Sequence, residues 1–126
     1  MTAIIDASVL VYAAGIRADA RRASLARELL ERLRPEACLS WRVLCEFSAV
    51  ALRHGVGAGD CRVIVAEYSR SWTVLLPTAS TLETALDGVR DHRLSFWDAM
   101  LWATAKENDL AAIVTEDGPQ GRPSRA

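Results

Sequence analysis

Short apolar runs alternate with longer amphipathic stretches along the whole chain, and this alternation limits its possible folds more than any other feature. The apolar runs have the length of buried strands and fall at residues 3–5, 37–39, 73–76 and 111–115. Between them, apolar residues recur at helical spacing. The predicted helices span residues 8–14, 18–33, 41–53, 59–69, 80–91 and 95–108. Strands that alternate with helices in this way predict an α/β fold, in which helices cover both faces of a parallel sheet.

The bulk composition is typical of one globular domain, here residues 1–126, because 51% of the residues are apolar and 25% are charged. The net charge of -1 excludes nucleic-acid binding through overall positive charge, so such binding would need a local basic patch or a bound cation. Three cysteines without a C-x-x-C pair suit a reducing compartment. With no leader and no apolar run of membrane-spanning length, we expect no membrane association and a cytoplasmic protein.

Two acidic residues follow predicted strands at the edge where parallel sheets bind ligands. Asp6 ends the first strand and Asp117 follows the fourth, and such sheets bind ligands outside the carboxyl ends of their strands. Each acid also has a purely structural interpretation. Asp6 could be the N-cap of the following helix, a role that Ser8 could equally fill. Asp117, which precedes Gly118, could belong to a turn. Glu116, beside Asp117, has no assigned role, because consecutive residues after a strand tend to point apart.

Two further acids lie on predicted helices. Glu46 interrupts a strongly apolar helix. It is either a residue of a functional site or the partner of Arg42 in a structural ion pair at the i,i+4 spacing. Asp98 lies three residues after Ser95, a spacing that also favours helix capping. Trp97 and Trp102, on the same helix, are predicted to lie in the core rather than to form a base-stacking platform. None of these positions is decisive alone.

The chemistry of these four acids indicates a hard cation. Carboxylate oxygens without histidine or cysteine suit Mg²⁺, and Mn²⁺ accepts similar ligands. The two histidines are isolated in the sequence, so histidine-based acid–base chemistry has little support. Nucleotide-binding, hydrolase-triad and zinc-protease motifs do not occur.

The acids and the residues around them resemble a PIN domain, in particular the VapC-type toxins of bacterial toxin–antitoxin pairs. The matching segments are residues 4–8, 40–47, 94–101 and 113–117, with Gly121 four residues beyond Asp117. These four short segments occur in the family's order and are spread over nearly the whole chain. The resemblance implies a three-layer α/β/α fold with strand order 3-2-1-4-5.

One departure concerns the last strand, because nothing in residues 121–126 has the pattern of a strand. We therefore expect a PIN-like parallel sheet of order 3-2-1-4 whose fifth strand is missing. Three explanations stay open: the sheet has four strands, the fifth strand comes from elsewhere, or the chain is a truncated and weakened variant.

The resemblance also implies a function, a site and partners. The function is Mg²⁺- or Mn²⁺-dependent endonucleolytic cleavage of RNA by a toxin that a cognate antitoxin inhibits, commonly as a homodimer. The implied catalytic and metal-binding acids are Asp6, Glu46, Asp98 and Asp117, with Glu46 acting through water or a second ion. The resemblance implies that Ser8 and Thr115 supply hydroxyls that orient those acids or metal-bound water, and Glu116 is grouped with them as a supporting residue without a role of its own. The basic residues chosen for phosphate contact are Arg42, Arg93 and Arg122.

A competing hypothesis is a binding module, in which a catalytically impaired PIN fold holds RNA or a protein partner without cutting it. A phosphatase with an aspartyl nucleophile is a third hypothesis, but its chemistry expects an acid two residues after Asp6, where this chain has Ser8.

Overall fold

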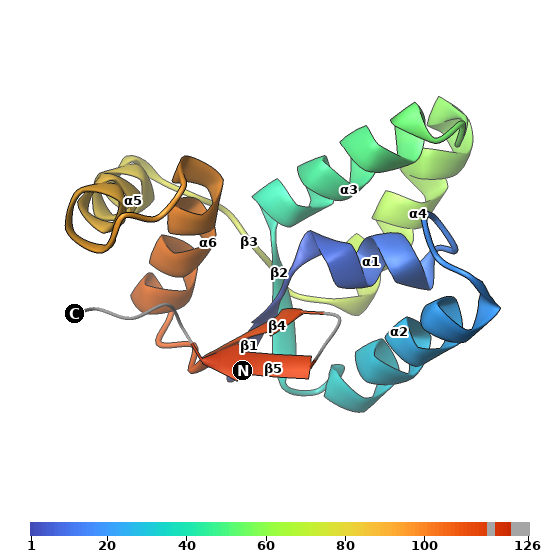
Figure 1. Ribbon diagram of the computed structural model, residues 1–126, viewed down its shortest axis with the longest axis horizontal. Helices are drawn as coiled ribbons and strands as arrows, with labels where there is room; N and C mark the ends of the chain where they lie inside the picture. The colour runs from blue at the N-terminus through green and yellow to red at the C-terminus, as the bar shows by residue number, and fades with distance from the viewer. Residues whose placement is uncertain (116–117, 122–126) are drawn as a thin grey trace.

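The computed structural model describes residues 1–115 together with the backbone of residues 118–121. A central sheet lies between two groups of helices, with α1 to α4 on one side and α5 and α6 on the other (Figure 1). In chain order the elements are β1 (Ala3–Ile5), α1 (Ala7–Ala13), α2 (Ala20–Leu33), β2 (Ala37–Ser40), α3 (Trp41–Arg53), α4 (Ala58–Ser71), β3 (Val74–Leu75), α5 (Ala79–His92), α6 (Phe96–Glu107), β4 (Ala112–Thr115) and β5 (Gly118–Gly121). The predicted three-layer α/β/α architecture is confirmed.

The strands follow the order β3-β2-β1-β4-β5, so the predicted parallel order 3-2-1-4 is also confirmed. β1 is central and pairs in parallel with β2 and β4, with Ile4 opposite both Cys38 and Ile113. The chain runs from β1 to β2 and β3 on one side of β1 and then crosses to β4 and β5 on the other side, so the strand order reverses at β1. The carboxyl ends of β1 and its neighbours are therefore where a ligand site is expected.

The expectation of a missing fifth strand was wrong. β5 pairs antiparallel with β4, from Thr115 opposite Gly118 to Ala112 opposite Gly121. Its sequence, Gly-Pro-Gln-Gly, lacks the apolar and β-branched residues by which a strand is recognised. The pairing depends on backbone groups at the sheet edge, where a proline such as Pro119 is tolerated. Backbone pairing of this kind leaves no hydrophobic pattern in the sequence.

Alternate residues of β1 supply the two halves of the core. Ala3 and Ile5 belong to the large cluster that α1 to α4 complete, whereas Ile4 belongs to a smaller cluster with Ala105 of α6. All three β1 residues are buried. A strand that is covered on both faces reads as a continuous apolar run, and this explains why β1 was recognisable from three residues.

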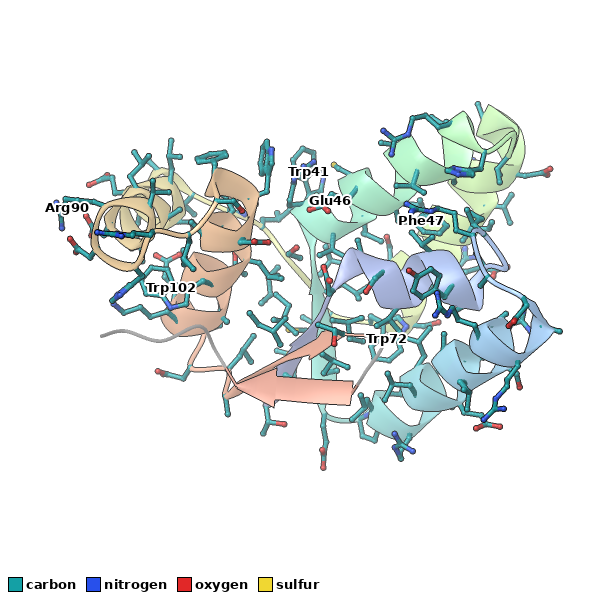
Figure 2. The ribbon with its side chains drawn as sticks, viewed as in Figure 1. Trp41, Glu46, Phe47, Trp72, Arg90 and Trp102 are labelled. Carbon is teal, nitrogen blue, oxygen red and sulfur yellow. The ribbon has the colours of Figure 1, made fainter. Side chains whose placement is uncertain are left out.

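Helices α5 and α6 pack against each other as a separate pair beside the sheet. Trp102 of α6 is 1% exposed and lies between them (Figure 2). Gly88 of α5 allows this approach, because a Cβ atom there would lie 2.7 Å from Trp102 Cζ3.

Within the described residues, no helix is both long and apolar enough to cross a membrane.

Candidate functional site

A small pocket of about 50 Å³ opens at the carboxyl edge of the sheet. The N-terminal ends of α1, α3 and α6 lie at this edge (Figure 1). Three of the four predicted acids line it: Asp6 from the end of β1, Glu46 from α3 and Asp98 from α6. Glu46 lies near the start of α3, above the strand ends (Figure 2). Elements that are distant in the sequence thus bring three carboxylates to one pocket.

Asp6 is the N-cap of α1 and is partly buried. Its Oδ1 accepts a hydrogen bond from the Ala7 backbone N–H at 2.8 Å, and its Oδ2 accepts one from the Ser8 hydroxyl at 3.3 Å. Burial raises the pKa of Asp6, the two hydrogen bonds lower it, and the negative charge of Asp98 raises it further, with a net upward shift. The capping interpretation of Asp6 is therefore correct, and it coexists with a position in the pocket. Ser8 does not cap the helix but holds the Asp6 carboxylate.

Glu46 lies one turn after Arg42 on α3, and the two form an ion pair with Arg42 Nε 3.4 Å from Glu46 Oε1. Burial raises the pKa of Glu46, and Asp6 and Asp98 add to this effect, whereas Arg42 lowers it; the net shift is upward. The structural pairing predicted from the i,i+4 spacing is present. Because both residues also line the pocket, the pair is part of the site.

Asp98 lies in the first turn of α6, and its backbone N–H donates to the Ser95 hydroxyl at 3.4 Å. Ser95 therefore caps the helix, as its spacing predicted. The neighbouring Trp97 was predicted to lie in the core, and this was wrong: its side chain is 50% exposed and lines the pocket. Trp102 lies in the core as predicted. The buried face of α6 includes Ala99, Met100 and Trp102, which leaves Trp97 at the mouth of the pocket.

The remaining predicted residues lie elsewhere. Asp117, Glu116 and Arg122 fall outside the described residues. Thr115 is the half-buried last residue of β4. Arg93 is exposed at the C-cap of α5 with a left-handed backbone conformation, φ 54°, and it does not line the pocket.

The donor chemistry of the pocket fits Mg²⁺ or Mn²⁺, because its acidic side chains offer only oxygen atoms. The negative charge of Asp98 raises the pKa of Asp6, and the charges of Asp6 and Asp98 raise the pKa of Glu46. A cation bound among them would relieve this repulsion. In this conformation, however, no three His, Cys, Asp or Glu side chains in the described part of the chain lie close enough together to hold a metal ion. Arg42 supplies the positive charge beside Glu46 instead.

A mostly parallel sheet, covered by helices on both faces and with a carboxylate-lined pocket at its switch point, defines the class of protein: an α/β protein with an acidic pocket where such sheets bind ligands. The sequence matches the PIN domain family over residues 3–124, and the chain belongs to this family.

Solved structures support the same fold. A toxin–antitoxin complex from Klebsiella pneumoniae superposes with a TM-score of 0.70 at 18% identity, covering 89% of this chain and 83% of the other. VapC20 of Mycobacterium tuberculosis, a toxin that cleaves the sarcin-ricin loop, gives 0.75 at 21% identity, covering 90% and 88%. A protein of Pyrobaculum aerophilum gives 0.62 at 19% identity, covering 91% and 78%. No curated protein matches the sequence. At these identities the likeness establishes the fold.

Proposed function

We propose that this protein is a metal-dependent endoribonuclease that acts as the toxin of a toxin–antitoxin pair. The observation that carries the proposal is the convergence of Asp6, Glu46 and Asp98 on one pocket at the switch point of the sheet. Membership of the PIN family supports it, as does the likeness to a toxin that cleaves the sarcin-ricin loop. The proposed substrate is the phosphodiester backbone of RNA.

Asp6 and Asp98 would hold Mg²⁺ or Mn²⁺ directly, together with Asp117, and Glu46 would complete the set through water or a second ion. When bound, the cation supplies a Lewis acid that activates water and neutralises phosphate charge. Ser8 fixes one oxygen of Asp6 by hydrogen bonding. Arg42 neutralises Glu46 and brings a guanidinium to the pocket, where it would contact the phosphate. Thr115 and Glu116 would support Asp117 from the neighbouring strand end.

The proposed partner is a cognate antitoxin, by analogy with the complex from Klebsiella pneumoniae. We also expect a homodimer. Co-expression with the product of an adjoining small gene, followed by size-exclusion chromatography with light scattering, would test both expectations.

Replacing Asp98 or Asp6 with Asn tests the proposed activity. Asp60 supplies a matched control, because it is an exposed acid in the first turn of α4, as Asp98 is in α6, and does not line the pocket. We expect wild type and Asp60→Asn to cut a fluorescent single-stranded RNA in Mn²⁺, with EDTA blocking cleavage. Asp6→Asn and Asp98→Asn should remain folded by circular dichroism and lose cleavage.

Two results would contradict the proposal. Normal cleavage by both Asp6→Asn and Asp98→Asn would show that the pocket is not the active site. If the folded wild-type protein instead binds RNA but leaves it intact in Mn²⁺ and in Mg²⁺, the binding-module hypothesis replaces the nuclease.

A further inference from the structure

An aromatic side chain lies exposed at the mouth of the carboxylate pocket. Trp97 directly precedes Asp98 on α6, lines the same pocket and keeps half of its surface in solvent. Phe96 lies against it edge-on, with ring centroids 4.7 Å apart and planes at 69°. Exposing a tryptophan forgoes the free energy that its burial would provide.

Arg42 connects this ring to the acids. Its guanidinium carbon lies 3.6 Å from the centroid of the Trp97 ring, while its Nε faces Glu46 at 3.4 Å. That Nε is fully buried and makes no hydrogen bond within the described structure. The indole and the guanidinium therefore form a stacked pair, held between α6 and α3, that places a flat aromatic surface and a positive charge side by side.

We propose that Trp97, with Arg42 stacked on it, forms a subsite for an unpaired nucleobase of single-stranded RNA, next to the phosphate to be cut. This inference rests on the proposed function for the identity of the substrate. Aromatic rings and guanidinium planes are the groups on which unstacked RNA bases pack. A base in a duplex is stacked on both faces and cannot reach the ring, so the subsite selects single strands, loops or bulges.

Because the protein lacks an overall positive charge, a stacking contact would add RNA affinity that electrostatic attraction does not provide. With a net charge of -1 and three acids in the pocket, the chain has little electrostatic attraction for RNA. Stacking does not depend on charge, and it binds any base because every base has a π face. The two members of the subsite should therefore differ in salt dependence: loss of Trp97 should weaken binding equally at all salt concentrations, whereas loss of Arg42 should reduce the salt dependence itself.

The experiment measures binding of a fluorescent single-stranded RNA of about ten nucleotides, within the usual span of such sites, in EDTA so that no cleavage occurs. Trp97→Ala should weaken binding about 5- to 100-fold, the range expected when one base–aromatic stack is lost, and Trp97→Phe should retain part of the affinity. Trp41→Ala is the matched control, because Trp41 is 51% exposed but lines a different groove, between α3 and α4. It should bind as wild type does.

Tryptophan fluorescence adds a direct readout. RNA should quench the fluorescence of the wild-type protein and of Trp41→Phe, and Trp97→Phe should lose most of this quenching even when saturated with RNA. A fully paired RNA duplex should bind wild type and Trp97→Ala equally. Arg42→Gln should reduce the slope of log affinity against log salt by about one phosphate contact, with Trp97→Ala leaving that slope unchanged.

Failure of this subsite can be distinguished from failure of the nuclease. If Trp97→Ala binds single-stranded RNA as tightly as wild type while Asp98→Asn abolishes cleavage, the subsite is wrong and the nuclease stands. If wild type never cleaves RNA but the Trp97 variants lose affinity and quenching as expected, the subsite stands without the nuclease. Equal loss of affinity in Trp41→Ala and Trp97→Ala would also overturn the subsite.

Discussion

Replacing Gly88 with Ala should destabilise the protein through a single contact between α5 and α6. The added Cβ would lie 2.7 Å from Cζ3 and 2.8 Å from Cε3 of Trp102, well inside van der Waals contact. The indole has little room to move away, because it is 1% exposed and lies edge-on to His92, with ring centroids 5.4 Å apart. The helices must therefore separate or the ring must leave its preferred rotamer.

Two opposing contributions determine how much Gly88→Ala changes the free energy of unfolding. Overpacking a core contact costs about 1–3 kcal/mol, and Ala in a helix interior is favoured over Gly by about 1 kcal/mol. The expected net loss in the free energy of unfolding is therefore about 1 kcal/mol, within a range of about 0–2 kcal/mol. Gly59 of α4 is the matched control, because a Cβ there meets nothing within 4 Å. Gly59→Ala should be neutral or stabilising by up to about 1 kcal/mol.

Urea unfolding followed by circular dichroism measures both variants, and a double-mutant cycle isolates the contact. In a Trp102→Phe background the two clashing indole atoms are absent, so Gly88→Ala should there cause no loss of stability. Because Trp102 shares α6 with Trp97 and Asp98, displacement of this helix should also lower RNA cleavage by folded Gly88→Ala. If Gly88→Ala stabilises the wild-type protein as much as Gly59→Ala does, or costs the same with Trp102 and with Phe at position 102, the steric argument is refuted.

Three other perturbations have defined expected outcomes. Arg93→Gly should raise the free energy of unfolding by about 1 kcal/mol, because Arg93 holds a left-handed conformation at the C-cap of α5; a loss of stability in urea unfolding would contradict this. Burial raises the pKa of Cys38 from 9.0 to about 11. Because the unfolded chain then loses the thiol proton first, Cys38 stabilises the fold fully below pH 9 and progressively less up to pH 11, and Cys38→Ala should flatten the decline of melting temperature over this interval. Saturating Mn²⁺, at about 100 times its dissociation constant, should stabilise the wild-type protein by about 2.7 kcal/mol; an equal gain in Asp98→Asn would place the ion elsewhere.

The sequence predicted those parts of the fold that depend on hydrophobic pattern and local capping. Helix α3 spans the predicted residues, because Ser40 accepts a hydrogen bond from the Val43 backbone N–H at its start. β1 was recognisable because both of its faces are buried. β5 was not, since its pairing with β4 uses backbone groups and its four residues have no apolar periodicity. Strand order 3-2-1-4 came from the family resemblance, because a hydrophobic pattern does not say which strands become neighbours.

The site residues likewise divide into those predicted from the sequence pattern and those predicted only from the family resemblance. The position of Asp6 followed from the rule that ligands bind at the carboxyl ends of parallel strands. Asp98 and Glu46 lie on helices, and their approach to Asp6 depends on how α6 and α3 pack, which only the family resemblance anticipated. Trp97 was misplaced because α6 carries apolar residues on most of its circumference, so the sequence does not reveal which of its aromatic residues faces solvent.

Glu46 forms the ion pair with Arg42 that the sequence predicted, and it also lines the pocket with Asp6 and Asp98. The pKa of Glu46 is raised even though Arg42 lies beside it, so burial and the charges of Asp6 and Asp98 outweigh one guanidinium. The lining of the pocket carries three carboxylates and one guanidinium, and this excess of acidic groups opposes the approach of a phosphate. A divalent cation among the acids would offset that excess of negative charge, and a contact that does not depend on charge, such as stacking on Trp97, would hold the RNA whether or not the cation is bound.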